Sequence, residues 1–96
     1  MHPYSVYILY SKAADRFYIG QTEDLDARLL MHREKTFTNA FTIIADDWEI
    51  YWHLECESRE TALKIESYIK QMRNRKYYYA LKTYPDATRK LIERFK

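Results

Sequence analysis

The amino-acid sequence predicts an α+β fold in which a small three-stranded antiparallel sheet is flanked by helices, within one domain over residues 1–96. Two short apolar runs near the start are rich in strand-forming residues, and the short polar loop between them predicts a hairpin. A third run alternates apolar and polar residues, and helical patterns follow it. The predicted order of elements is therefore strand, strand, helix, strand, helix, helix.

The first two strands are expected at residues 6–10 and 17–20, joined by the loop 11–15. The first of them is apolar throughout, which is typical of a strand buried on both faces. The third strand is expected at residues 49–56. Its alternation predicts an inward face made of Ile50, Trp52, Leu54 and Cys56.

The first helix is expected to begin after Thr22, whose hydroxyl suits an N-cap, and to run to about Glu34. Acidic residues in its first turn stabilise the helix by interacting favourably with the helix dipole. Residues 35–47 form a polar, irregular linker. Ser58 is expected to cap a long helix over 59–74, and two more helical stretches follow, at 75–83 and from Pro85 to the chain end.

The composition predicts an ordinary cytoplasmic globular protein. Hydrophobic residues make up 47% of the chain and charged residues 31%. No apolar run approaches the roughly 18 residues that a membrane span needs, and no secretory signal is visible. Cys56 is the only cysteine, so an internal disulfide and a cysteine-based zinc site are both excluded.

The positive charge is concentrated at the C-terminal end. Residues 70–96 hold nine Lys and Arg against two carboxylates, a net +7, which leaves −5 for residues 1–69. Tyr77, Tyr78, Tyr79 and Tyr84 are interleaved with these basic residues, which suits phosphate contact and base stacking. A solvated helical surface whose tyrosines pack on the core is the structural alternative.

Two helices carry polar residues on faces that should be buried. In the first helix, Arg28 and His32 share one stripe with Leu25 and Leu29. In the long helix, Glu66 lies beside an apolar stripe. The members of that stripe are Ala62, Ile65, Ile69 and Met72. A carboxylate there is costly to desolvate unless it is paired or bound to a cation.

Each of these residues also has a structural interpretation. Arg28 could pair with Glu66, His32 could be a satisfied buried histidine, and Glu66 could accept an ion pair from Arg73.

As a set, these residues resemble a known family. The tripeptides at 6–8 (Val-Tyr-Ile) and 18–20 (Tyr-Ile-Gly) look like the paired signature of the GIY-YIG nucleases. The resemblance continues through Arg28, His32 and Glu66, in the family's order and over nearly the whole chain. It is greatest to the small stand-alone bacterial endonucleases similar to the N-terminal domain of excinuclease C.

The resemblance implies a metal-dependent endonuclease that acts on DNA, with repair or recombination as its setting. Glu66 would hold a single Mg²⁺ or Mn²⁺, and Arg28 would contact the scissile phosphate. Tyr7 would help to activate the attacking water, and Tyr18 would orient water or phosphate. His32 would accept a proton or position the nucleophile.

Basic residues that follow Glu66 are expected to contact the nucleic acid, namely Lys70, Arg73, Arg75 and Lys76. Several positions depart from the family pattern, among them Ser5, which replaces the first glycine, and Tyr78, which stands where many members have asparagine. The acidic pair Asp46 and Asp47 departs from the usually basic linker that would meet substrate.

Well-characterised members carry a separate DNA-targeting domain, for which 96 residues leave no space. The protein would therefore cut with little sequence preference, or a protein partner would deliver the substrate. The sequence favours no oligomeric state. The competing interpretations are a non-catalytic nucleic-acid-binding module with the same fold and a protein-interaction domain.

Overall fold

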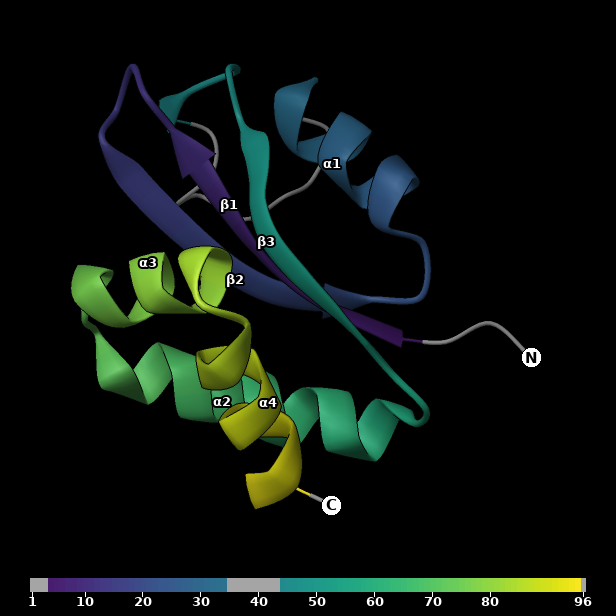
Figure 1. Cartoon of the computed structure of the whole chain (residues 1–96). Helices are drawn as coiled ribbons and strands as arrows, with labels where there is room; N and C mark the ends of the chain where they lie inside the picture. Colours follow the sequence, from purple (N-terminus) through teal and green to yellow (C-terminus); the bar gives the residue numbers. More distant parts are fainter. Residues whose placement is uncertain (1–3, 35–43, 96) are drawn as a thin grey trace.

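The computed structural model describes residues 4–34 and 44–95 and has the predicted α+β architecture (Figure 1). Its three antiparallel strands lie in the order β2-β1-β3, with bounds β1 Tyr4–Ser11, β2 Arg16–Thr22 and β3 Glu49–Cys56. The helices are α1 Leu25–Arg33, α2 Arg59–Met72, α3 Arg75–Thr83 and α4 Pro85–Arg94. Most of the linker predicted over 35–47 lies outside the described residues. No helix among the described residues is both long and apolar enough to cross a bilayer.

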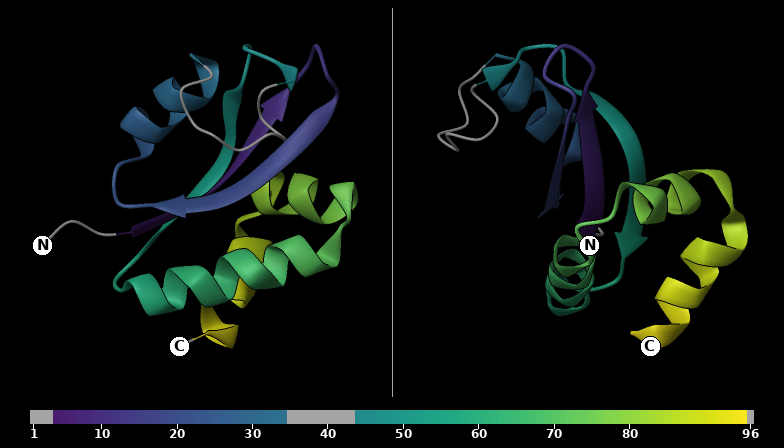
Figure 2. Two further views of the ribbon diagram at one scale, coloured as in Figure 1. Left: turned by 180° about the vertical axis from the view of Figure 1, so that it is seen from behind. Right: turned by 90° about the vertical axis from the view of Figure 1, so that its left-hand side faces the viewer.

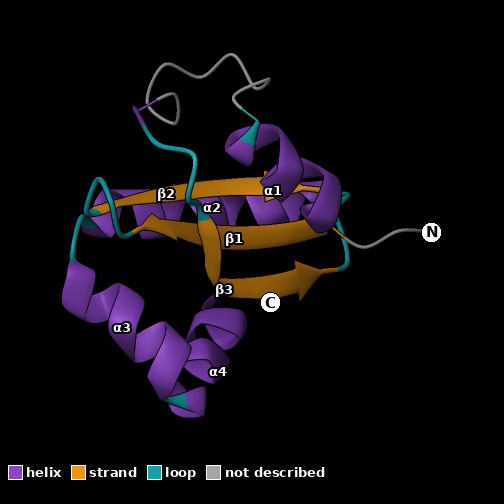
Figure 3. Ribbon diagram, turned by 90° about the horizontal axis from the view of Figure 1, so that it is seen from above, coloured by secondary structure: helices purple, strands orange, loops and turns teal. Residues whose placement is uncertain are grey.

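The sheet lies between two sets of helices, α1 on one face and α2, α3 and α4 on the other (Figures 1 and 2). On the α1 face, Tyr7, Leu9 and Trp48 form a small buried cluster with Leu25 and Leu29 packed against it. A larger core on the other face joins alternate residues of β1 to the three remaining helices. Figure 3 shows the strands side by side, with α2 behind β2 and β1. α2 therefore packs mainly against β1 and β2.

The loop between β1 and β2 is held by a carboxylate from the linker. The Ser11 hydroxyl and the Ala13 backbone N–H both donate to Asp47, at 2.5 and 2.9 Å. These bonds lower the pKa of the Asp47 carboxyl, with the Ser11 bond the largest cause. The linker that contains Asp47 was expected to meet the substrate. In the structure, Asp47 stabilises the β1–β2 hairpin.

One predicted strand face is partly wrong because β3 contains a bulge. The register with β1 shifts between Ile8 and Leu9, which pair with Trp52 and Ile50. The extra residue, Tyr51, breaks the two-residue period, so Ile50 packs in the α1-side cluster while Trp52 packs in the other core.

The helix starts confirm one predicted cap and correct the other. Ser58 caps α2 as predicted, since its side chain accepts from the Thr61 N–H. Thr22 does not cap α1, because it ends β2 and its hydroxyl accepts from the Asp24 N–H. Asp24 itself is the N-cap of α1 and accepts from the Ala27 N–H at 3.1 Å.

The apolar stripe of α2 is confirmed for three of its four residues. Ala62, Ile65 and Ile69 are buried in the core against the sheet. Met72 was predicted among them but is 37% exposed, because it is the last residue of α2 and extends past the core.

Two non-glycine residues have left-handed backbone conformations, Asp15 at φ 51° and Arg73 at φ 44°. Asp15 gains compensation, since its carboxylate accepts from the Tyr10 hydroxyl and from Arg75. Arg73 is the C-cap of α2, and its side chain forms no hydrogen bond or ion pair with any residue in the described ranges. Its conformation is one that glycine adopts without cost.

Replacing Arg73 by glycine is therefore expected to raise the free energy of unfolding by about 1 kcal/mol. The matched change Asp15→Gly relieves a similar strain but removes two side-chain hydrogen bonds, so no gain is expected. Urea unfolding of both variants measures the difference. A loss of stability in Arg73→Gly would show that the left-handed conformation carries no strain.

Candidate active site

The signature tyrosines lie next to each other on the α1 face of the sheet. In the antiparallel register, Tyr7 pairs with Gly20 and Leu9 with Tyr18, so the two tyrosine side chains project from neighbouring strands on the same side. Their ring centroids are 6.2 Å apart. The ring of Tyr7 passes over Gly20, where an added Cβ would lie 2.5 Å from the Tyr7 hydroxyl oxygen. The glycine therefore makes room for Tyr7.

His32 completes a three-ring cluster from the helix above. It is fully buried, and its Nε2 lies 3.3 Å from the Tyr7 hydroxyl oxygen in a hydrogen bond. Its ring centroid is 6.1 Å from that of Tyr7 and 4.8 Å from that of Tyr18. The prediction from the helical periodicity that His32 faces the interior of the protein is therefore confirmed.

Burial dominates the electrostatics of this cluster. It raises the pKa of Tyr7 well above its usual value. Tyr18 adds to this rise in pKa, the charge of Arg28 opposes it, and the charge of Glu66 adds to it. Burial and then the charge of Arg28 lower the pKa of His32 from 6.5 to about 4. At neutral pH Tyr7 keeps its proton and His32 is uncharged, so the imidazole has a lone pair that accepts a proton.

These shifts also relate the five predicted residues to one another. Tyr7, Tyr18 and His32 are in contact, and both Arg28 from α1 and Glu66 from α2 act on the Tyr7 hydroxyl through their charges. The charge of Arg28 acts on His32 as well. The five residues come from β1, β2, α1 and α2.

The depressed pKa of His32 predicts a loss of stability in mild acid. Between pH 6.5 and about 4 the unfolded chain takes up a proton that folded His32 refuses, so the free energy of unfolding falls as the pH falls through this window. Denaturant unfolding from pH 7.5 to 4.5 should show a smaller fall for His32→Gln. The control His53→Gln, which removes an exposed histidine from β3, should behave like the wild type. Equal falls in all three proteins would contradict the assignment.

Glu66 is largely buried and forms an ion pair with the half-exposed Lys70. Its side chain is 17% exposed, and one carboxylate oxygen accepts from the Lys70 ammonium at 2.7 Å. The sequence offered Arg73 as the partner of Glu66, and the structure instead shows Lys70, one helical turn away. The second carboxylate oxygen of Glu66 forms no hydrogen bond or ion pair with any residue in the described ranges.

The surroundings of Glu66 suit a divalent cation that takes few ligands from the protein. The described residues contain no group of three or more His, Cys, Asp or Glu that could enclose a metal. A single carboxylate with an open oxygen suits Mg²⁺ or Mn²⁺, which commonly take one or two carboxylates and fill the other positions with water and substrate phosphate. The ion pair with the Lys70 ammonium shows that a positive charge fits beside the Glu66 carboxylate.

The four basic residues expected to contact nucleic acid differ in their surroundings. Lys70 is paired with Glu66, while Arg75 pairs with Asp15 and donates to its backbone carbonyl, which ties α3 to the β1–β2 hairpin. The side chains of Arg73 and Lys76 form no hydrogen bond or ion pair with any described residue and lie exposed. Arg75 therefore has a structural task that the sequence did not reveal.

The tyrosines of the basic end divide in the same way. Tyr78 is buried in the main core and Tyr77 packs against it, as the structural alternative expected. Tyr79 and Tyr84 are 54% and 57% exposed and have rings accessible for stacking.

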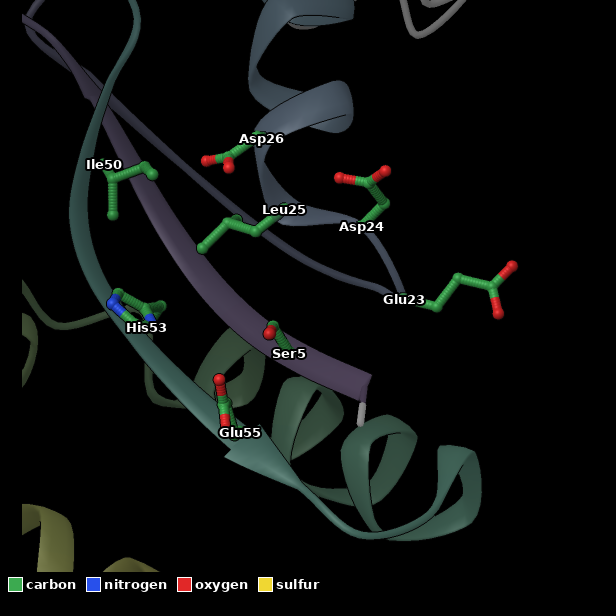
Figure 4. A pocket seen from close by; sticks show the side chains of 8 residues that line it. All are labelled: Ser5, Glu23, Asp24, Leu25, Asp26, Ile50, His53 and Glu55. Carbon is green, nitrogen blue, oxygen red and sulfur yellow. The ribbon is translucent and has the colours of Figure 1, made fainter. Parts of the chain in front are cut away.

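An acidic cavity lies elsewhere, between the start of α1 and β3 (Figure 4). Its volume is about 720 Å³, and Ile50 and Leu25 contribute apolar surface to it. The remaining lining residues are Ser5, Glu23, Asp24, Asp26, His53 and Glu55. None of the five predicted site residues lines it, and four carboxylates would repel a phosphate. We therefore exclude it as a nucleic-acid site.

Two further residues that were not predicted as site residues lie beside Arg28. Gln21 and Arg59 line a small polar cavity together with Arg28. Arg59 precedes Glu66 by seven residues and lies on the same side of α2, a spacing that was visible in the sequence.

Comparison with known proteins identifies a family for this chain. A family model described as the GIY-YIG catalytic domain matches residues 3–78. The matched segment contains all five predicted site residues, Tyr7, Tyr18, Arg28, His32 and Glu66. Comparisons with curated proteins and with solved structures gave no significant match.

Proposed function

The chain belongs to the GIY-YIG catalytic-domain family, and on that premise we propose that it is a divalent-metal-dependent endonuclease that hydrolyses phosphodiester bonds in DNA. The observation that carries the proposal is the buried hydrogen bond between Tyr7 and His32, which lies within the electrostatic reach of both Arg28 and Glu66. A protein that only bound nucleic acid would have no use for this arrangement.

Tyr7 and His32 form the proton path of the proposed reaction. Because its pKa is raised, Tyr7 is almost entirely protonated at neutral pH and does not act as a preformed phenolate base. It acts instead as a proton relay. As water attacks phosphorus, its proton moves to the Tyr7 oxygen while the Tyr7 proton moves to His32 Nε2. This requires the ring proton of His32 to be on Nδ1.

Arg28 and Tyr18 orient the phosphate in this mechanism. The planar guanidinium of Arg28 binds two phosphate oxygens at once and stabilises the negative charge that grows on them in the transition state. The Tyr18 ring packs against both Tyr7 and His32, and its hydroxyl suits a contact to water or phosphate.

Glu66 would hold the metal. A divalent cation bound there would supply Lewis-acid stabilisation of the charge on the phosphate and leaving oxygens. Lys70 would exchange its contact with Glu66 for one with the nucleic-acid backbone, where Arg73 and Lys76 extend the basic surface. Arg75, which is engaged with Asp15, would contribute charge without leaving its ion pair.

The experiment that tests the proposal is incubation of the purified protein with labelled single-stranded DNA, duplex DNA, branched DNA and RNA. Each substrate is tested with Mg²⁺, with Mn²⁺ and with a chelator, and a binding assay is run in parallel. Internal cuts that need the metal are the expected result, and the preferred substrate identifies the class of target.

Two other outcomes would replace the proposal. Salt-sensitive binding without cuts in any substrate would favour the non-catalytic binding module. Absence of both binding and cuts would favour a protein-interaction domain. A requirement for a protein partner would appear as cuts only after addition of cell extract, abolished by Glu66→Gln.

A further inference from the structure

A small polar cavity opens at the β2 edge of the sheet, next to Arg28. Its volume is about 200 Å³, and it lies where β1 begins, β2 ends and α2 begins. The residues that line it are Tyr4, Gln21, Thr22, Glu23, Arg28 and Arg59. In Figure 1 the start of β1 and the start of α2 lie on the same side of the molecule as the connection from β2 to α1. All six have polar side-chain groups, so the cavity suits a hydrated, charged ligand rather than an apolar one.

The charges in this cavity favour an anion. Two guanidiniums, Arg28 and Arg59, line it against a single lining carboxylate, Glu23. Arg59 is exposed and forms no hydrogen bond or ion pair with any described residue. Its five N–H donors are therefore available to a ligand, in a geometry that matches phosphate oxygens.

Gln21 provides a second and independent indication of a ligand. The side-chain oxygen of Gln21 is buried and accepts no hydrogen bond from the residues that the structure describes. A buried polar atom without a partner costs about 1–3 kcal/mol, and such atoms commonly mark a place that a water or ligand completes. Rotation of the amide by 180° presents NH₂ donors at the same place.

The position along α2 relates this cavity to the proposed metal residue. Arg59 and Glu66 are seven residues apart on one side of the helix, which corresponds to about 10 Å along its axis. One strand of B-form DNA rises about 3.4 Å per nucleotide, so this separation spans about three nucleotides. Arg28 lines the cavity and, in the proposed mechanism, also contacts the scissile phosphate.

We propose that this cavity is a binding subsite for a backbone phosphate that flanks the scissile one, and that Arg59 is its principal contact. The inference rests on the proposed function and identifies how the substrate is held. It implies a substrate that extends on at least one side of the cut, as an internal linkage in a polynucleotide does.

The first test measures binding, which does not depend on cleavage. Fluorescence anisotropy with a labelled duplex, in the presence of a chelator, gives the affinity at several salt concentrations for the wild type and for Arg59→Gln. The variant is expected to bind about 10-fold more weakly at low salt, and the slope of log K against log salt should fall by about 0.9, the value for one lost phosphate contact. Arg59→Lys keeps the charge and should keep the slope.

The matched control is Arg89→Gln. It removes the same charge from an exposed arginine of α4, which is not among the elements that line the cavity, and it should leave the slope unchanged. Circular dichroism of each variant verifies the fold. If Arg59→Gln and wild type have the same slope, the subsite is refuted while the proposed function stands. If the wild type binds no nucleic acid even at low salt, the proposed function fails as well.

The second test locates the phosphate. A single methylphosphonate in the labelled strand removes one backbone charge, so wild-type cuts should be depleted at a fixed offset of one to three nucleotides from the modification. Arg59→Gln should cut with no depletion at that offset. Depletion that persists in Arg59→Gln would assign the contact to another residue and overturn the inference.

Discussion

Replacing Glu66 by glutamine is expected to reduce metal-dependent cleavage by on the order of 10³-fold, with the fold intact. Glutamine has almost the same shape as glutamate but lacks the charge that a divalent cation needs. Single-turnover cleavage of a labelled substrate at saturating Mn²⁺ measures the effect. Loss of the partially exposed ion pair with Lys70 should change the free energy of unfolding by less than about 1 kcal/mol.

The chain contains a matched control for this substitution. Glu60 lies on the same helix and pairs with Lys64 four residues later, in the same arrangement as Glu66 and Lys70, but both partners are exposed. Glu60→Gln should therefore cut as fast as the wild type. If Glu66→Gln and Glu60→Gln both cut as fast as the wild type, the role of Glu66 is refuted. If both variants lose activity to the same extent, the loss reflects a general effect of charge on the helix.

The second large effect is expected from Gly20→Ala. The added methyl group would lie 2.5 Å from the hydroxyl oxygen of Tyr7 and 2.7 Å from its Cζ, closer than packed atoms approach. Tyr7 is buried, so its ring cannot move into solvent. We expect a loss of about 1–3 kcal/mol in the free energy of unfolding. A displacement of the hydroxyl by about 1 Å would also reduce cleavage by roughly 10²-fold.

A double-mutant cycle isolates the cause of this loss. In a Tyr7→Phe background the closest contact disappears with the hydroxyl, while the contact with Cζ persists. Gly20→Ala should therefore destabilise the Tyr7→Phe protein less than the wild type. An equal loss in both backgrounds would assign the effect to the backbone of β2 rather than to Tyr7.

The first two strands and their pairing were predictable from the sequence because the signals are local. Two short runs of β-branched and aromatic residues with a brief polar loop leave few alternatives to a hairpin. The bulge in β3 was not predictable, since a period of two assumes an unbroken ladder. Tyr51 inserts one extra residue and turns Ile50 to the opposite face of the sheet from Trp52.

The candidate site was predictable where a polar residue lay within an apolar stripe. His32 and Glu66 stood out in this way, and the structure holds His32 fully buried and Glu66 largely so. The partners of such residues could not be predicted, because several basic residues lie within reach on the same helix. Lys70 rather than Arg73 pairs with Glu66, since Arg73 follows the helix end in a left-handed conformation.

Two residues, one in the linker and one at the start of α3, make tertiary contacts that local sequence patterns do not reveal. Asp47 fastens the β1–β2 hairpin through Ser11, and Arg75 ties the same hairpin to α3 through Asp15. Both partners are distant in sequence, so neither contact leaves a periodic signal. The acidic linker that seemed unfavourable for nucleic acid is, at Asp47, part of the scaffold.

The most direct test of the central claim is the cleavage rate as a function of Mn²⁺ concentration, at a fixed amount of labelled DNA. For the wild type, we predict a rate that is near zero with a chelator and rises to saturation with the metal. The curve for Glu66→Gln should remain near zero over the range in which the wild type saturates. Superimposable curves for the two proteins, or wild-type cleavage that does not change on metal removal, would contradict the assignment of Glu66 as the residue that holds the catalytic cation.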